Sequence, residues 1–199
     1  MSQGTLLTFD LMDTVVVDPF YREVMSYLQT TLAELAQVKH PTSWLEFETG
    51  KADEKDFLSR FYRENTGLQI TQAEQFKQVF FNAYRFVDGM EELLAQLCVG
   101  DSRLWVLSNY SPWFEVIRDR LSLDRFFTGY CLSYQTGYRK PDPRAYQALF
   151  QQASCLPEDC LLIDDRTCNI EAGLQEGMNC LYFEDTASLR EALRKRNIL

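Results

Sequence analysis

Histidine is the residue that this sequence most nearly lacks, since His40 is the only one among 199 residues. A Ser-His-Asp hydrolase needs a histidine as its base, and a histidine that directly precedes Pro41 is expected at a helix end or on the surface. The chain also contains no G-x-S-x-G sequence and no G-x-x-x-x-G-K-[ST] loop for nucleotide phosphates. These absences exclude a Ser-His-Asp hydrolase and a P-loop for nucleotide phosphates.

Long apolar runs, paired cysteines and positive charge are also scarce. No run approaches the roughly 20 apolar residues of a membrane span, and the first apolar run is too short for a signal peptide and contains Asp10. The net charge of -9 argues against binding to nucleic acid or anionic lipid. Six cysteines without C-x-x-C spacing indicate reduced thiols, at positions 98, 131, 155, 160, 168 and 180. We therefore expect a cytoplasmic protein that binds neither nucleic acid nor membrane.

The first apolar run has the pattern of a buried strand that ends in an acid. Four apolar or β-branched residues lead directly into Asp10, and a carboxylate beside a core needs a cation, a donor or a function. Ligands of open α/β sheets collect at the carboxyl ends of the strands, so Asp10 is a candidate nucleophile or metal ligand. A turn or helix-capping aspartate is the alternative interpretation.

The rest of the chain divides into two patterns. Residues 19–86 are rich in aromatics and show helical spacing, which predicts helices over 21–39, 53–65 and 71–84 and a short segment over 44–50 that ends at a glycine. From residue 88 onward, helices alternate with short apolar strands at 103–107, 130–133, 160–163 and 179–183. Such alternation is typical of an α/β fold with a parallel sheet. We expect a core of residues 1–18 and 87–199 and an inserted all-α unit of residues 19–86, joined through hinges near 15–20 and 84–89.

Polar residues follow several of the predicted strands and are expected to meet at one edge of the sheet. They are Asp10, Ser108, Lys140, Asp164 and Asp165. Three carboxylates in one crevice repel one another unless a cation joins them, and Mg²⁺ prefers oxygen ligands. The lysine and the serine can hold a phosphoryl group, which suits phosphoryl transfer to a carboxylate. Taken singly, Ser108 can be a turn residue, Lys140 a solvated charge and Asp165 part of a helix N-terminus.

Four motifs in this order resemble those of the haloacid dehalogenase-like hydrolases. The matching segments are Phe9-Asp10-Leu11-Met12-Asp13-Thr14, Leu107-Ser108-Asn109, Arg139-Lys140-Pro141-Asp142 and Leu161-Leu162-Ile163-Asp164-Asp165. The helical insertion is similar to the cap that this family carries between its first two motifs, so the resemblance covers nearly the whole chain. It implies a Rossmann-like core, an all-α cap and a small phosphorylated substrate.

The resemblance also implies a role for each motif residue. Asp10 would be the nucleophile and a Mg²⁺ ligand, and Asp164, Asp165 and the backbone carbonyl of Met12 would complete the metal site. Ser108 and Lys140 would hold the phosphoryl group, with Asn109 and Arg166 as further substrate-binding neighbours.

The chain departs from the family's phosphatases at Met12, where they have the aspartate that protonates the leaving group. A thioether cannot do this, and its loss costs about 10² to 10⁴ in rate; Asp13 is a possible substitute. We expect a magnesium-dependent phosphohydrolase that is slow or restricted to good leaving groups. The alternatives are a non-catalytic relative that binds a phosphorylated ligand or a protein partner, and a dehalogenase. Family dehalogenases also lack the second aspartate, but have tyrosine at the Met12 position and need no metal.

Overall fold

The computed structural model describes residues 5–100 and 102–199 of the chain. Its sheet has five parallel strands in the order β3-β2-β1-β4-β5. The central strand pairs with both neighbours, so that Phe9 lies opposite Val106 on one side and Ile163 on the other. The strands are β1 (Leu6–Phe9), β2 (Arg103–Ser108), β3 (Gly129–Leu132), β4 (Cys160–Asp164) and β5 (Asn179–Tyr182). The predicted parallel α/β sheet is confirmed.

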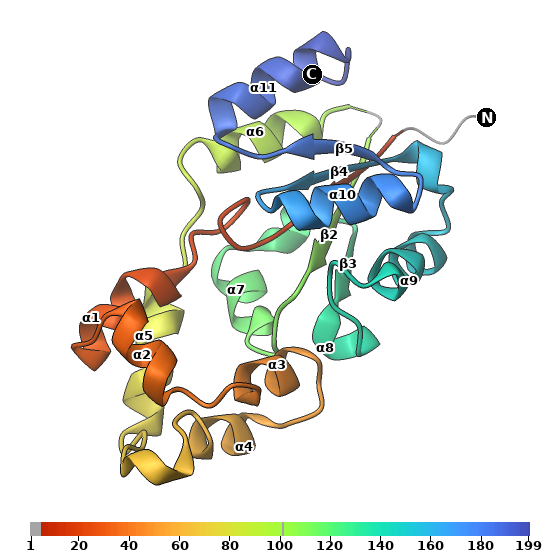
Figure 1. Cartoon of the computed structure of the whole chain (residues 1–199). Helices are drawn as coiled ribbons and strands as arrows, with labels where there is room; N and C mark the ends of the chain where they lie inside the picture. The colour runs from red at the N-terminus through yellow and green to blue at the C-terminus, as the bar shows by residue number, and fades with distance from the viewer. Residues whose placement is uncertain (1–4, 101) are drawn as a thin grey trace.

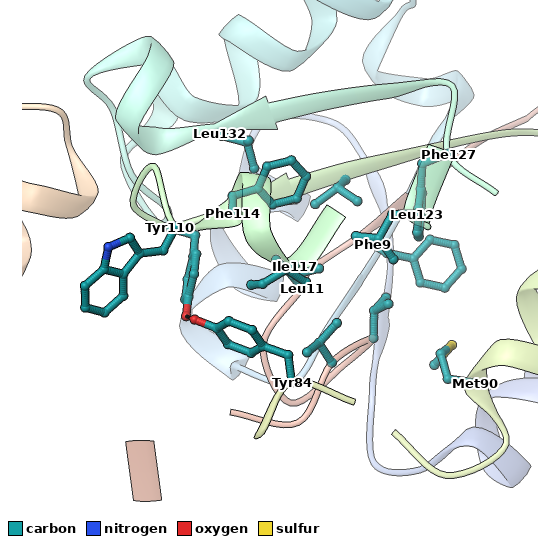
Figure 2. Packing of buried hydrophobic residues seen from close by; sticks show 14 of the residues in the cluster. Phe9, Leu11, Tyr84, Met90, Tyr110, Phe114, Ile117, Leu123, Phe127 and Leu132 are labelled. Atoms are coloured by element: carbon teal, nitrogen blue, oxygen red, sulfur yellow. Dashed lines mark hydrogen bonds between the residues drawn. The ribbon is translucent and has the colours of Figure 1, made fainter. Parts of the chain in front are cut away.

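Helices cover both faces of the sheet (Figure 1). One face packs against α6 (Met90–Leu97), α7 (Phe114–Arg120) and α11 (Thr186–Lys195), and the other against α9 (Pro143–Ala153) and α10 (Thr167–Gln175). Strand β1 serves both faces, because Leu7 and Phe9 belong to the first core and Leu6 to the second. Figure 2 shows Phe9 in the first core, among Phe127, Leu123 and Ile117.

The segment between β1 and α6 is helical and lies to one side of the sheet (Figure 1). It contains a short 3-10 turn (Pro19–Tyr21), α1 (Glu23–Leu28), α2 (Leu32–Val38), α3 (Ser43–Glu48), α4 (Glu54–Ser59), a second 3-10 turn (Glu64–Thr66) and α5 (Ala73–Ala83). In the described part of the chain, no helix has the length and apolar content needed to cross a membrane.

The single helix predicted over residues 21–39 is wrong. Gln29 adopts a left-handed conformation with φ of 51°, and Thr31 then caps a new helix by accepting a hydrogen bond from Glu34 N at 3.3 Å. The helix predicted over 53–65 also ends early, at Ser59. The apolar residues keep their helical spacing through both interruptions, because separate short helices can pack against the same core. The spacing alone therefore did not indicate where each helix ends.

The two chain segments that connect the helical segment to the sheet are hydrogen-bonded to each other. Val17 N donates to Arg85 O, and Val87 N donates to Val15 O, both at 3.0 Å. These hydrogen-bonded residues lie within the predicted hinges near 15–20 and 84–89. The division into domains of residues 1–18 with 87–199 and residues 19–86 stays a prediction, and residues 1–4 lie outside the described part.

Trp113, at the start of α7, anchors the helical segment to the rest of the molecule. It is 3% exposed, and five rings from the helical segment lie around it with centroid distances from 5.1 to 6.2 Å: Trp44, Phe47, Phe57, Phe80 and Phe81. These rings form the contact between the helical segment and the sheet-bearing part.

Candidate active site

Asp10 lies directly after β1, at the carboxyl edge of the sheet, and it is only 8% exposed. Its backbone N donates to Ile163 O at 2.8 Å, which fixes it beside the end of β4. Lys140 Nζ donates to Asp10 Oδ1 at 2.7 Å and to Asp164 Oδ2 at 2.6 Å. One buried ammonium therefore bridges two carboxylates from adjacent strands.

The loop before α9 brings Lys140 to this position through Asn109. The side-chain amide of Asn109, which follows β2, accepts from Lys140 N at 2.7 Å and donates to Lys140 O at 2.8 Å. The oxygen and the nitrogen of this amide thus both bond to the backbone of Lys140. Asn109 thus positions the lysine, in addition to lining the cavity described below.

Asp164 is fully buried and is held from the start of α10. Asn169 Nδ2 donates to both of its oxygens, at 2.9 and 3.0 Å, and Arg166 N donates to Oδ1 at 2.9 Å. These bonds, with the one from Lys140, compensate for the removal of its charge from water.

Carboxylate oxygens of Asp10, Asp164 and Asp165 lie within 4.8 Å of one another. Asp165 Oδ1 is buried and has no hydrogen-bond partner among the residues that the structure describes. A buried carboxylate oxygen without a donor is costly, and a hard cation beside it removes that cost. The donor set therefore fits Mg²⁺.

Burial and mutual charge shift the pKa values of Asp10 and Lys140. Burial raises the pKa of Asp10 to about 7, against the lowering effect of Lys140, and the charge of Asp164 raises it further. Burial acts to lower the pKa of Lys140, but the two carboxylates outweigh it and raise that pKa above its ordinary value. Lys140 is thus a permanent cation at neutral pH.

A cavity of about 260 Å³ opens above these groups. Its lining includes the motif residues Asp10, Met12, Ser108, Asn109 and Lys140 and their predicted neighbour Arg166. The helical segment contributes Phe20, Tyr21, Lys39, Trp44, Glu48 and Phe80 to the lining. Two residues predicted for the site, Asp164 and Asp165, are not among the lining residues. Asp164 contacts the lining through its hydrogen bond from Lys140.

Asp13, the possible substitute for the missing aspartate, is exposed and does not line the cavity. It adopts a left-handed conformation with φ of 55°, and its Oδ1 accepts a hydrogen bond from Asp18 N at 3.0 Å. Asp18 does line the cavity, and burial raises its pKa to about 6. Its Oδ1 accepts from Phe20 N at 2.9 Å.

Sequence reasoning missed Asp18, Lys39, Glu48 and Asn169. Glu48 is 3% exposed, and its Oε1 lies 2.7 Å from Arg139 Nε. Burial raises the pKa of Glu48, and Arg139 counteracts this. Asp18, just before Pro19 at the first hinge, is the only one of the four with a sequence signal, since this pair is typical of a helix start.

A family profile described as haloacid dehalogenase-like hydrolase matches residues 5–177. The chain belongs to this family. The fold, the motif order and the geometry at the sheet edge agree with that membership.

Two curated relatives extend the comparison. The chain is 35% identical over 188 residues to the chloroplastic flavin mononucleotide hydrolase 1 of Arabidopsis thaliana, covering 94% of this chain and 76% of that protein. It is 24% identical over 199 residues to the D-ribitol-5-phosphate phosphatase of Bacteroides thetaiotaomicron, covering 94% of this chain and 95% of that one.

Solved structures share the fold. A family enzyme of Bacteroides thetaiotaomicron, in complex with magnesium and inorganic phosphate, superimposes with a TM-score of 0.75 at 18% identity, covering 94% of this chain and 98% of the other. The L-2-haloacid dehalogenase of Xanthobacter autotrophicus gives 0.68 at 16% identity, covering 98% and 84%. The same fold is thus found in an enzyme that binds magnesium and phosphate and in a dehalogenase. The fold alone therefore does not identify the reaction, and the residues of the site must do so.

Proposed function

We propose that this protein is a magnesium-dependent phosphohydrolase that acts on a small phosphomonoester through Asp10. The observation that carries the proposal is the bridge of Lys140 between Asp10 and Asp164 beside the unpartnered oxygen of Asp165. A dehalogenase needs a nucleophilic aspartate but no cluster of three carboxylates. A phosphoryl group adds negative charge to this cluster, and a metal cation bound there neutralises part of that charge.

The residues divide the work as follows. Asp10 attacks phosphorus, the bond to the leaving-group oxygen breaks, and water then releases phosphate from the aspartyl phosphate. Lys140 and Ser108 hold the phosphoryl oxygens, and Asn109 keeps Lys140 in place. Asp10, Asp164, Asp165 and the carbonyl of Met12 would hold Mg²⁺, which supplies charge neutralisation at the phosphate when bound. Helices α1–α5 act as a cap over the cavity.

The cavity walls favour a leaving group with a flat ring. Phe20, Tyr21, Trp44, Phe80 and Tyr110 all line it, and rings stack readily on aromatic walls. The Arabidopsis relative is named for hydrolysis of flavin mononucleotide, whose leaving group carries such a ring. Flavin mononucleotide is therefore the first substrate to test.

Release of an alkyl alcohol such as this one needs a proton, which Met12 cannot supply. Outside the carboxylate cluster, Asp18 and Glu48 line the cavity, and burial raises the pKa of both, that of Asp18 to about 6. Glu48 is already the ion-pair partner of Arg139, which leaves Asp18 as the candidate proton donor. We assign proton donation to Asp18. Without proton donation by Asp18, we expect the protein to act only on substrates with good leaving groups, such as acyl and aryl phosphates.

The test is phosphate release with Mg²⁺ from flavin mononucleotide, p-nitrophenyl phosphate and acetyl phosphate, using the wild type, Asp10→Asn, Asp18→Asn and Met12→Asp. We expect turnover that is lost in Asp10→Asn. Asp18→Asn should slow the alkyl ester about 10² to 10⁴-fold and acetyl phosphate far less.

Other results separate the alternatives. A wild type that cleaves only acetyl and p-nitrophenyl phosphate would restrict the protein to good leaving groups. A silent wild type beside an active Met12→Asp variant would contradict the proposed hydrolase and favour a non-catalytic binder of phosphorylated ligands or of a protein partner.

A further inference from the structure

The cavity contains a cation that the phosphoryl chemistry does not use. Lys39 lies at the end of α2 and lines the cavity, and the described part of the chain offers its Nζ no hydrogen bond and no ion pair. Lys39 Nζ lies 5.7 Å from the centroid of the Phe20 ring. The other cavity lysine, Lys140, is fully engaged by two carboxylates.

Lys39 is partly buried and faces the cavity, as a ligand-binding group does, whereas a typical surface lysine is surrounded by water. Burial lowers the pKa of Lys39, and Glu48 is the carboxylate whose charge opposes this. Glu48 is itself paired with Arg139, so its charge is already largely satisfied. An ammonium that is partly removed from water and unpaired is unfavourable, unless a ligand supplies the acceptor.

The backbone on either side of Lys39 is fixed by neighbouring elements. Lys39 N donates to Leu35 O at 2.7 Å, and Arg63 Nε donates to Lys39 O at 3.1 Å. His40 N donates to Phe61 O at 2.9 Å, and Arg63 N donates to Val38 O at 2.8 Å. The ammonium is therefore presented to the cavity from a rigid frame, which lowers the entropy that ligand binding must overcome.

We propose that Lys39, together with Phe20 and Trp44, selects the substrate by binding an oxygen-bearing or anionic edge of an aromatic ring in the leaving group. This rests on the proposed function, which places the phosphoryl group at Lys140. The rings stack on the substrate's face, while the ammonium meets the acceptors at its edge. The flavin ring fits this description, because one of its edges carries two carbonyl oxygens.

The first measurement is binding, so that it does not depend on turnover. Riboflavin, the leaving group without its phosphate, is titrated against the wild type, Lys39→Gln, Lys39→Arg and Lys55→Gln, with flavin fluorescence as the signal. Lys55 is an exposed lysine on α4 of the same helical segment and is the matched control. We expect Lys39→Gln to weaken riboflavin binding about tenfold or more. Lys39→Arg should recover part of the loss, and Lys55→Gln should bind like the wild type.

The second measurement is kinetic. Lys39→Gln should raise KM for flavin mononucleotide by a similar factor with little change in kcat. The inhibition constant of inorganic phosphate should stay unchanged, because the proposed function places phosphate at Lys140. Equal binding of riboflavin by the wild type and Lys39→Gln overturns the proposal, as does equal weakening of riboflavin and phosphate.

The proposal and the proposed function fail separately. A wild type that hydrolyses phosphomonoesters but binds no riboflavin overturns the assignment of Lys39 and leaves the phosphohydrolase in place. A wild type that binds riboflavin through Lys39 but releases no phosphate supports the assignment and contradicts the phosphohydrolase.

Discussion

At the scale of single residues, the site depends on charges that are buried in pairs. Lys140 is 1% exposed, and its two partners, Asp10 and Asp164, come from different strands. Such a group contributes little net free energy when complete, but removing one member leaves the others buried and unpaired. The lysine is therefore a structural requirement as well as the phosphate-binding group of the proposed function.

Lys140→Met tests the structural part. We expect it to lower the free energy of unfolding by about 3–5 kcal/mol at neutral pH, measured by urea denaturation without Mg²⁺. Lys195→Met is the control, because its pair with Glu191 is exposed and should contribute at most about 1 kcal/mol. A Lys140→Met protein as stable as the wild type would contradict the ionised bridge.

Asp18 gives the pH-dependent prediction. Because burial raises its folded pKa from 3.8 to about 6, the stability associated with protonated Asp18 is present below the unfolded pKa and is lost as pH rises through about 6. Asp18→Asn resembles the protonated form. It should be more stable than the wild type by about 1–3 kcal/mol at pH 8, with the difference shrinking toward pH 4.

The measurement is denaturation at several pH values. Asp53→Asn is the matched control, since Asp53 is an exposed aspartate that caps α4 through Asp56 N at 2.8 Å. A constant difference between Asp18→Asn and the wild type across this pH range would show that the charge of Asp18 is not the cause.

At the scale of secondary-structure elements, the position of the cavity wall depends on how closely α3 approaches α8 (Ser133–Thr136). Gly50 follows α3 with φ of 69°, and a Cβ there would lie 2.4 Å from Tyr134 O. Ser133 Oγ also donates to Glu48 O. This contact places Glu48, and with it one wall of the cavity, against the sheet-bearing part.

Gly50→Ala should break this approach, while Gly67→Ala serves as its control. Gly67 has a similar φ, 67°, but nothing within 4 Å of the added Cβ. Both variants incur backbone strain of about 1 kcal/mol, and Gly50→Ala should lose about 1–3 kcal/mol more and raise KM. Thermal unfolding and steady-state kinetics measure the two effects. Equal losses would place the whole effect in the backbone conformation.

At the scale of the whole molecule, we expect the net charge of -9 and the carboxylate cluster to make stability depend on cations. Mg²⁺ that binds the folded state alone stabilises it by about 2.7 kcal/mol at one hundred times its dissociation constant. We expect Tm to rise with Mg²⁺, and EDTA to reverse the rise.

General screening of the negative charge must be separated from binding at the site. NaCl at equal ionic strength measures the screening, and Asp165→Asn should remove most of the Mg²⁺-specific part, because Asp165 carries the unpartnered oxygen. The same rise in Tm in Asp165→Asn and the wild type would contradict a metal site at this cluster.

The sequence alone determined the sheet and its polar edge. Short apolar runs that end at Asp10, Ser108 and Asp164 predict strands and place their last residues together, because parallel strands share one carboxyl edge. The order of the motifs was enough to indicate the family, and the residues that line the cavity floor were predicted from it. Periodicity within one strand or helix is a local property, so a linear reading can find it.

Only the tertiary structure decided what surrounds these residues. Lys140 and Asp10 are 130 positions apart, and Asn109 and Lys140, which exchange two hydrogen bonds, are 31 positions apart. The break at Gln29 turned one expected helix into two and set Lys39 at the end of the second. Hydrogen bonds and burial arise between distant segments that meet when the chain packs, and no spacing along the sequence records them.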